Sequence, residues 1–511
     1  MDQNTYGRHQ QAAEASSDKG IADTVAHHYN NLDEKGKEQR KESRIYFMRN
    51  FNNWTKSMLI QEYSDKVKES RPELTRNNHR QDGFHRQDRG GSYHGNHNNP
   101  SQNRGYQDRR WDNGRQGNSY GHHGRDDRRH ANDGHDYRDR DDRNNSGSRE
   151  RGDDQNSIRH GQCEDTKFSV LDLGCGKGGD LLKWSKAGVD YVTCVDIAQT
   201  SVEQARSRYS DMKQRNRGRI FKADFFDADC TKTRLLPQYQ NHESKNGSTE
   251  GTSTKFDIVS CQFAFHYSFE SESQAECMVK NAAESLKIGG FFIGTTPDAD
   301  VIWKRLRNEQ SSNAGQTWFG NSVYSVTFDE TSPVMTLINQ SLNESETQTK
   351  LAGNIPKDLP KFGVRYNFHL EGVVDCPEFL VNFDALCDIA DRHGLVLVAK
   401  QGFENFFKKK RDTRDGANLL RRIKALEEYP PPHGTSLVGS NYPAAEEYLT
   451  RLKNHREQDD NSRNNAYIRP DREPIFMLED RPGRDFRLGT LSQEEWEAVT
   501  FYCVFAFKKI R

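Results

Sequence analysis

The chain has few of the residues that fill protein cores. Only 32% of its 511 residues are hydrophobic, which is low for a globular protein. Between Thr75 and Ser157 there is no Leu, Ile, Val or Met at all. A stretch of that length without aliphatic side chains cannot bury enough apolar surface to offset the entropy lost on ordering it. We therefore predict that this part of the chain is disordered.

Further absences exclude several kinds of protein. The nine cysteines are scattered singly without a C-x-x-C pair, which favours a reducing, intracellular environment and no structural zinc. No apolar run approaches the length of a membrane span, and the first residues, MDQNTYGRHQ, lack the apolar core of a signal peptide. The net charge is −1, so a surface for nucleic acid would need local clusters of cations. We expect a soluble protein without a metal or a membrane partner.

The pattern divides the chain into unequal parts. Composition alone predicts a mobile tail over the first 30 residues, followed over 34–68 by apolar side chains at helical spacing. These predict one or two helices that end before Pro72. From about 71 to 165 follows a low-complexity tract of Arg, Asp, Asn, Gly and His. Because Arg and Asp nearly balance there, it is a mixed-charge tract and not a polybasic arm.

From Phe168 onward, strands and helices alternate. Such alternation calls for a mostly parallel sheet with helices on both faces. A helix beginning at Ser492 is indicated by a capping box with Glu495. The segments expected as strands are 169–174, 191–197, 219–224, 256–265, 289–296, 323–328, 364–372, 395–403 and 502–509; those expected as helices are 180–187, 200–215, 273–286 and 383–393; and 241–254, 308–316 and 454–465 are expected as surface loops.

A glycine-rich loop, DLGCGKGGD, follows the first of these strands. It contains Gly174-x-Gly176-x-x-Gly179 at the start of a helix, where backbone amides can approach a nucleotide or a carboxylate closely. Alone the pattern is weak, because a tight strand-to-helix turn uses the same residues. Asp196 ends the next strand, where an acid would accept both ribose hydroxyls of a cofactor. That placement serves NAD and S-adenosylmethionine equally.

Three further polar residues bear on the choice of cofactor. Asp172 lies two residues before Gly174, where nicotinamide-binding loops usually carry an apolar residue and methyltransferase loops often carry an acid. It therefore favours methyl transfer. Asp229, after the third strand, is suited to accept from an adenine amino group, although an ordinary loop aspartate is about equally expected. Gln262 ends a strand where the substrate side of such a fold begins.

Five blocks carry a specific resemblance. FNNWTKS, VLDLGCGKGGDLLKW, SCQFAFHYSFES, EGVVDCPEFLVNF and EEWEAVTFYCVFAFKK together resemble the eukaryotic mRNA cap guanine-N7 methyltransferases, in that family's order. The resemblance implies a class I, Rossmann-like fold dependent on S-adenosylmethionine, and methylation of GpppN-RNA to m7GpppN-RNA with S-adenosylhomocysteine as the other product. It implies four parts: a tail (1–21), an N-terminal helical part of the methyltransferase domain (22–70), an insertion that departs from the family pattern (71–165) and the catalytic domain (166–511).

The resemblance also implies roles for individual residues. Neither a metal nor a general base is expected, and Glu378, His266 and Tyr502 would position the guanine. The implied cofactor contacts are Lys56, Gly174, Asp196, Asp229, Gln262 and Tyr267, and the implied cap contacts are Asn52, Lys177, Lys183, Arg208, His266, Glu378 and Tyr502.

These roles fit the chemistry of the residue types. Lys177, Lys183 and Arg208 would place cations near a triphosphate bridge, and Glu378 is a two-oxygen acceptor suited to the guanine N1–H and amino edge. His266 offers hydrogen bonds and aromatic surface beside the base, as does Tyr502. Without the resemblance, Lys183 and Arg208 on predicted helices would be interpreted as solvated charges. His266 would be interpreted as a structural histidine, and Tyr502 as a core residue.

Three other functions stay open at this point. A methyltransferase of the same fold with a small-molecule or protein substrate explains the glycine loop, but not the PEFLV and HYSFES blocks. An NAD-dependent oxidoreductase would bind NAD in place of S-adenosylmethionine. A non-catalytic RNA-binding adaptor would work through its Arg, Gly and Tyr-bearing tract. For the favoured function the expected partner is 5′-capped RNA, with capping or transcription machinery as a further candidate and the nucleus as the implied location.

Overall fold

The computed structural model describes residues 20–31, 41–74, 167–236, 255–343, 354–459, 474–479 and 486–511, all within one unit of the fold. The predicted tail before residue 20 and almost all of the predicted 71–165 insertion lie outside these residues, as does the loop expected at 241–254.

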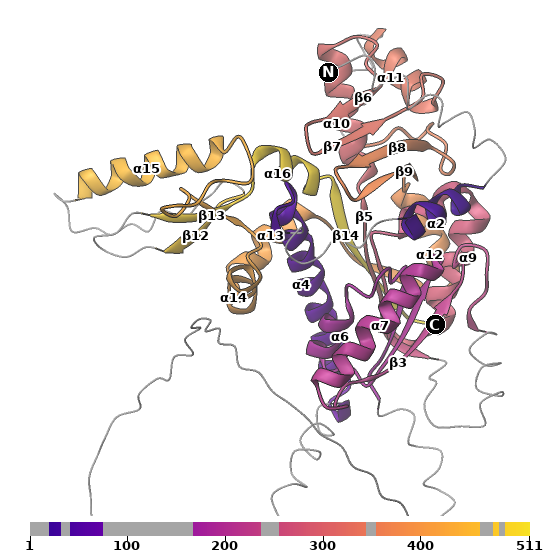
Figure 1. Ribbon diagram of the computed structural model, residues 1–511. Coiled ribbons are helices and arrows are strands. Elements are labelled where there is room, and N and C mark those ends of the chain that lie inside the picture. The colour runs from indigo at the N-terminus through magenta and orange to yellow at the C-terminus, as the bar shows by residue number, and fades with distance from the viewer. Residues whose placement is uncertain are drawn as a thin grey trace, which may run out of the picture. The chain divides into compact units, whose positions relative to one another are not determined.

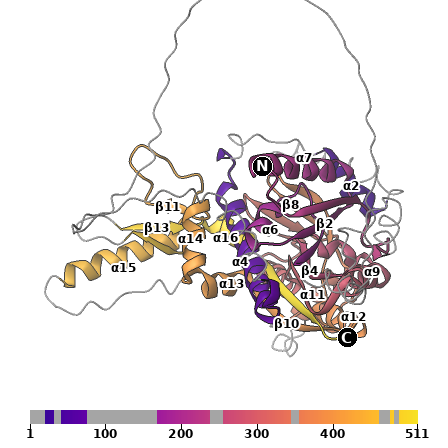
Figure 2. The ribbon, with the colours of Figure 1, turned by 90° about the horizontal axis from the view of Figure 1, so that it is seen from below.

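A seven-stranded sheet organises the described part of the chain (Figures 1 and 2), in the order β10-β14-β5-β4-β1-β2-β3. Neighbouring strands are parallel except for β14, which runs antiparallel to both β5 and β10. The expected mostly parallel sheet is thereby confirmed. Its strands are β1 (Ser169–Leu173), β2 (Tyr191–Asp196), β3 (Lys222–Asp227), β4 (Phe256–Gln262), β5 (Leu286–Pro297), β10 (Leu395–Gly402) and β14 (Tyr502–Lys509).

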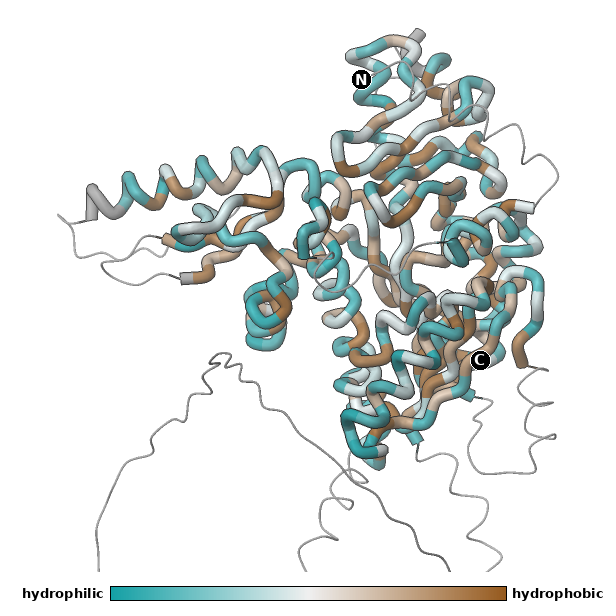
Figure 3. The backbone as a smooth tube through the Cα atoms, viewed as in Figure 1, coloured by the Kyte–Doolittle hydropathy of each residue, from teal (hydrophilic) through white to brown (hydrophobic). Residues whose placement is uncertain are grey.

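Side chains that alternate along the strands pack into two separate cores. Val170 and Ile258 join a cluster with residues of the long N-terminal helix, whereas Leu171 and Val259 join a second cluster on the opposite face. Figure 3 shows hydrophobic residues along these central strands and a largely hydrophilic α7. The first face is covered by α4 (Tyr46–Ser70), α6 (Leu181–Ala187) and α7 (Gln199–Arg215), and the second by α9 (Glu272–Ser285) and α12 (Phe383–Arg392).

A second, antiparallel sheet follows in the order β6-β7-β8-β9. The expected strands at 323–328 and 364–372 are confirmed as β7 and β8, and the register places Tyr366 on β8 opposite Glu378 on β9. The elements of this region are the 3-10 helix η1 (Phe265–Glu270), α10 (Ala299–Ser312), β6 (Trp318–Gly320), β7 (Tyr324–Thr327), α11 (Pro333–Asn343), β8 (Arg365–Leu370) and β9 (Val374–Phe379).

The predicted loops at 308–316 and 454–465 are wrong at their beginnings, because helices continue into them. In the first, α10 extends to Ser312. Gln310 is buried there and ties the helix end to the turn that follows: its amide donates to the Gln316 carbonyl at 2.5 Å and accepts from the Gly315 amide at 3.1 Å. The polar residues at the start of the predicted loop therefore belong to a helix end that the buried Gln310 joins to the following turn.

The carboxyl-terminal third adds a small three-stranded sheet, β11-β13-β12, with its own core beneath α15. The second wrong loop begins inside α15, whose buried Tyr448 and Leu452 belong to that core. The elements are α13 (Phe403–Arg411), α14 (Arg414–Ile423), β11 (Glu427–Tyr429), α15 (Pro443–Asp459), β12 (Phe476–Glu479), β13 (Arg487–Thr490) and α16 (Gln493–Val499).

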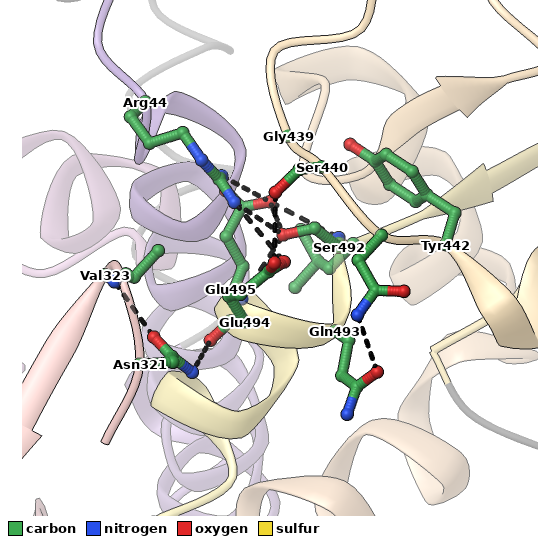
Figure 4. A network of polar contacts seen from close by, with 12 residues as sticks. Arg44, Asn321, Val323, Gly439, Ser440, Tyr442, Ser492, Gln493, Glu494 and Glu495 are labelled. Carbon is green, nitrogen blue, oxygen red and sulfur yellow. Dashed lines mark hydrogen bonds and ion pairs between the residues drawn. The ribbon is translucent and has the colours of Figure 1, made fainter.

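The start of α16 is a junction between these parts (Figure 4). Ser492 and Glu495 form the expected capping box, which is confirmed. Arg44, just before α4, donates to Ser492 Oγ at 3.1 Å, and Ser440 donates to Glu494 at 3.0 Å. Asn321, beside the second sheet, donates to the Glu494 carbonyl at 3.2 Å. Polar contacts from three regions of the chain therefore converge on one short helix.

The N-terminal helix α2 (Ile21–Asn31) corrects the prediction of a tail over the first 30 residues. It packs against α7 and β9. Val25 is buried, His28 Nε2 lies 3.3 Å from the Val373 carbonyl, and Asn30 accepts from the Thr200 amide at 3.2 Å. The helix forms because it has a partner surface, which its polar composition did not reveal.

Candidate active site

A cavity of about 350 Å³ lies at the carboxyl ends of β1, β2 and β4. Parallel sheets bind ligands at this edge, because the loops that leave the strands there converge. Two predicted cap residues, Lys177 and Arg208, line it. So do all the predicted cofactor residues, which are Lys56, Gly174, Asp196, Asp229, Gln262 and Tyr267.

The glycine loop forms one wall of the cavity, and two of its glycines are required by geometry. Gly174 has a φ of +66°, and a Cβ there would lie 2.6 Å from the Cβ of Ala264. Gly176 has a φ of +51° with open space where a Cβ would stand. Its backbone can therefore be approached closely from the cavity.

Asp196 is held in place at the end of β2. Its Oδ2 accepts from the Gly176 amide at 2.8 Å and its Oδ1 from the Ala198 amide at 2.9 Å. Burial raises the pKa of this carboxyl, against the effect of the two backbone hydrogen bonds. Because each carboxylate oxygen can accept a second hydrogen bond, Asp196 is oriented and still able to accept from a diol. Across the cavity, Asp229 accepts from the hydroxyl and amide of Thr231 at 2.6 and 2.9 Å.

Two lysines share one buried carboxylate at the rim. Lys56 Nζ lies 2.9 Å and Lys183 Nζ 2.8 Å from Asp180 Oδ1. Burial alone would raise the pKa of Asp180, but the ammonium groups of Lys183 and Lys56 hold it below its usual range. Lys183 also donates to Asn53 Oδ1 and to the Gly179 carbonyl, both at 3.0 Å. Lys183 does not line the cavity itself but is joined to it through Asp180.

Asp172 lies beneath the loop and is not among the residues that line the cavity. Its carboxylate accepts from Trp184 Nε1 at 3.1 Å, which fixes α6 against β1. Burial, and then the negative charge of Asp180, raises the pKa of Asp172 to about 7. Asp172, which favoured methyl transfer in the sequence, therefore supports the helix behind the glycine loop and does not line the cavity.

Helix α2 covers one side of the cavity. Tyr29 lines it and is partly buried, with its Oη 3.3 Å from the Oη of Tyr267. Tyr267 in turn lies 3.4 Å from the sulfur of Cys376 on β9. Burial, and then the neighbouring Cys376, raises the pKa of Tyr29. Sequence reasoning missed Tyr29, because a single tyrosine in a polar segment carries no local signal.

A second cluster surrounds Glu378 on β9, whose side chain is 3% exposed. Tyr366 donates to its Oε2 at 2.7 Å, and His266 Nε2 lies 3.2 Å from its Oε1. Burial, and then the charge of Glu378, raises the pKa of Tyr366 well above its usual range. These residues do not line the cavity, but Tyr267 and Cys376 connect the two clusters. Tyr366 was another residue that sequence reasoning missed.

Tyr502 packs into an aromatic group next to the cavity. Its ring meets that of Phe263 edge-on, with centroids 4.9 Å apart, and also contacts Phe403. Burial, and then the charge of Glu378, raises the pKa of Tyr502. Phe263, which lines the cavity with a φ of +60°, adopts a backbone conformation that side chains rarely take and that is enriched at functional sites.

Several predicted site residues carry buried polar atoms that find no hydrogen-bond partner within the described structure. These atoms are Asn52 Oδ1, Gln262 Oε1 and both ring nitrogens of His266, although His266 Nε2 lies within ion-pair distance of Glu378. Buried polar groups are normally paired, so the unpaired oxygen of Gln262, which lines the cavity, indicates a place where a ligand supplies the partner. Asn52 itself does not line the cavity.

Within the described ranges, no group of three or more His, Cys, Asp or Glu side chains is arranged to hold a metal ion. Nor does any helix among those residues have the length and apolarity to cross a membrane.

A mostly parallel sheet with helices on both faces, a glycine loop after its first strand and an acid at the end of the second define a class I S-adenosylmethionine-dependent methyltransferase. The model of the mRNA (guanine-N(7))-methyltransferase domain matches residues 12–76 and 155–510. The chain belongs to this family.

Relatives of known name agree. The chain is 33% identical to the mRNA cap guanine-N(7) methyltransferase of Drosophila melanogaster over 98% of this chain and 79% of the fly protein. It is 30% identical to the protein of that name from Caenorhabditis elegans over 95% and 86% of the two chains. A solved S-adenosylmethionine-dependent methyltransferase from Clostridium acetobutylicum aligns with 46% of this chain and 75% of its own, at 14% identity and a TM-score of 0.27, which adds nothing to the topology above.

Proposed function

We propose that the chain transfers a methyl group from S-adenosylmethionine to N7 of the guanosine that caps RNA, using the cavity and the adjoining Glu378 cluster as one site. The observation that carries the proposal is that one cavity gathers Asp196, Asp229 and Lys56 from distant parts of the sequence, with an unpartnered oxygen of Gln262 beside them. Each is a group that a cofactor with a ribose, an adenine and an amino acid end requires.

The residues fit S-adenosylmethionine end by end. Asp196 would accept from the ribose hydroxyls, and Asp229 would accept from the adenine amino group. At the other end, Lys56 would pair with the methionine carboxylate beside Gly174, while Gln262 Oε1 would accept from the ammonium group. Tyr267, held between Tyr29 and Cys376, would close the pocket. The cofactor supplies a methyl group on a positively charged sulfur, which is an electrophile without further activation.

Glu378 is the group best placed to recognise the guanine. As a carboxylate it would accept from N1–H and from the exocyclic amino group, donors that adenine does not present together. Tyr366 and the β8–β9 pairing hold it rigidly. His266, whose Nε2 faces Glu378 and whose Nδ1 is buried without a hydrogen-bond partner, would flank the base together with Tyr502. Lys177, Arg208 and Lys183, with Asn52, would face the triphosphate.

Positioning and electrostatics account for the catalysis. Guanine N7 carries a lone pair and no proton, so no side chain has to act as a general base. Holding N7 in line with the methyl–sulfur bond makes the step effectively intramolecular, a gain that can reach roughly 7 to 11 kcal/mol. The ring becomes cationic as it accepts the methyl group, and the buried charge of Glu378 stabilises that change more than it stabilises the ground state.

The proposal extends to where the chain works and with which partners. Capped RNA is its substrate, and capping or transcription machinery in the nucleus would deliver that substrate, because caps are added to nascent transcripts. The parts 22–70 and 166–511 form the methyltransferase domain, since α2 and α4 contribute Tyr29 and Lys56 to the same cavity as the later segments. Ile21, where α2 begins, lines the cavity, so the tail is proposed to end before this residue and, like the 71–165 insertion, to lie outside the catalytic centre.

A single assay tests this function. The purified chain is incubated with GpppG-ended RNA and methyl-labelled S-adenosylmethionine, and the RNA is digested to nucleosides and cap dinucleotides. The label is expected in m7G alone. Label in protein or in an internal nucleotide would overturn the proposal, and so would binding of NAD in place of S-adenosylmethionine.

A further inference from the structure

A second, larger cavity of about 700 Å³ forms a groove between α4, α6 and α14. Figures 1 and 2 show these helices next to one another, and α4 packs against both of the others. Of the predicted cofactor and cap residues, only Lys183 lines this groove.

Two cations face one another across the groove. Lys186 on α6 and Arg422 on α14 both line it and are both exposed. Partial loss of solvent around its ammonium group, and then the positive charge of Arg422, lowers the pKa of Lys186. Among the described residues, neither side chain forms a hydrogen bond or an ion pair. The carboxylate in the groove is that of Asp415, while Lys183 already has Asp180 as its partner. Two facing cations without counterions favour an anionic ligand.

The rest of the lining suits a nucleotide. Amide side chains provide hydrogen-bond donors and acceptors without charge, from Asn50, Asn53, Gln61 and Asn418. Leu182 adds apolar surface that is 54% exposed, with Ile423 beside it. The groove thus combines cations for phosphate groups with amide side chains for the edges of bases and aliphatic surface for their faces.

The groove adjoins the cofactor cavity. Gly179 lines both of them, and Lys183, which stands in the groove, shares Asp180 with Lys56 of the cavity. When the terminal guanosine lies at Glu378 and the triphosphate near Lys183, the groove is the adjoining surface that Lys183 itself lines. The groove is where its next residues would go.

We propose that the groove between α4, α6 and α14 binds the first nucleotides of the RNA after the triphosphate, with Lys186 and Arg422 contacting phosphodiester groups. This rests on the proposed function for the identity of the substrate. The contacts are to backbone phosphates and to unspecified bases, so they strengthen binding without selecting a sequence. The groove thereby distinguishes an RNA chain from a free cap dinucleotide.

The test compares substrates of different length. A K186A/R422A variant is assayed on the GpppG dinucleotide and on a 12-nucleotide GpppRNA, with K213A/R215A as the matched control. Lys213 and Arg215 lie exposed on α7 outside the groove, so the control removes the same two charges. The groove variant is expected to raise KM for the RNA about fivefold or more and to change KM for the dinucleotide less than twofold. The control should change neither.

Direct binding separates this proposal from the proposed function. A fluorescent, uncapped 5′-triphosphate RNA is titrated against each protein at several salt concentrations, without any methyl transfer. Loss of two phosphate contacts should lower the salt slope by roughly 1.4. If the unaltered protein methylates no cap, the proposed function fails, and this titration still decides on the groove.

The proposal is overturned if K186A/R422A affects dinucleotide and RNA equally or leaves both unchanged, or if K213A/R215A produces the same loss. It is also overturned if polyglutamate competes for the groove as well as RNA of equal charge, since an acidic protein partner would then be the better occupant. A K186E/R422E variant reverses both charges and should raise KM for the RNA further than K186A/R422A does. The melting temperature and S-adenosylmethionine binding of each variant show whether it is folded.

Discussion

Tyr366 donates a 2.7 Å hydrogen bond to Oε2 of Glu378, the residue directly opposite it on the neighbouring strand. Both side chains are buried, and His266 stands 3.2 Å from the other carboxylate oxygen. A buried carboxylate held in this way does not have to reorient when the charge of a bound ligand changes. In the proposed reaction, the ligand is a guanine ring that becomes cationic during methyl transfer.

Tyr366→Phe tests this relationship. Without the Tyr366 hydroxyl, Glu378 loses the group that fixes its orientation. We therefore expect kcat to fall about tenfold or more, in line with the loss of a hydrogen bond to a charged group. KM for S-adenosylmethionine should stay within twofold. The matched control is Tyr324→Phe in the same sheet, which loses a buried hydroxyl bonded to Arg305. Equal losses in the two variants would show that Tyr366 is merely structural.

Glu378→Gln tests the carboxylate itself. The amide keeps the shape but removes the charge and replaces one acceptor by a donor that would face the guanine amino edge. We expect kcat/KM for GpppRNA to fall by about two orders of magnitude or more, roughly 3 kcal/mol. Affinity for S-adenosylmethionine, measured by calorimetry, should hardly change. Glu371→Gln, in the exposed turn between β8 and β9, is the control. Near-normal turnover by a folded Glu378→Gln protein would remove this residue from the site.

Asp196→Ala tests the cofactor end. The change removes the acceptor proposed for the ribose diol, at a cost of about 1 to 3 kcal/mol. KM for S-adenosylmethionine should therefore rise far more than KM for the cap, when each substrate is varied separately. Asp196→Asn keeps one acceptor, so its KM for S-adenosylmethionine should lie between those of the unaltered protein and of Asp196→Ala. Equal damage to both constants would mean that the carboxylate only supports the glycine loop through the Gly176 amide.

Asp172→Asn tests a pH dependence. The folded chain holds the proton of Asp172 up to about pH 7, whereas an unfolded aspartate loses it near pH 4. The folded state therefore binds more protons between these values, and the contribution of this group to stability declines as pH rises. Asparagine does not titrate, so the variant should gain stability relative to the unaltered protein from pH 5 to pH 8 in urea denaturation. Parallel stability curves would contradict the raised pKa. Asp211→Asn, an exposed carboxyl on α7, is the control.

The cofactor half of the site could be predicted from local sequence. Gly174 and Asp196 each lie at or just after the end of a strand, and the position at the strand end determines that the residue faces the ligand edge of the sheet. Both residues line the cavity. The cap half depended on the resemblance, because Glu378 has no local signal: it lies on a short strand, β9, that alternation alone did not indicate.

What the sequence could not give is the set of neighbours that fix the site residues. Tyr29, Phe263 and Tyr366 come from segments far apart, and each matters through a tertiary contact. The wrong tail prediction has the same origin, since α2 is ordered by the surface of α7 and β9 on which it packs. Asp172 shows the converse, because a residue singled out by its place in a motif supports Trp184 beneath the loop.

The central claim, methyl transfer to N7 of a cap guanosine, is tested most directly by removing that one atom from the substrate. Three RNAs of the same sequence, ending in GpppN, 7-deaza-GpppN and ApppN, are incubated with the chain and labelled S-adenosylmethionine. We expect the GpppN RNA alone to take up label, since 7-deazaguanosine keeps the N1–H and amino edge but has no N7 lone pair. Comparable labelling of the 7-deaza RNA would contradict the account, because the methyl group would then be going to another atom.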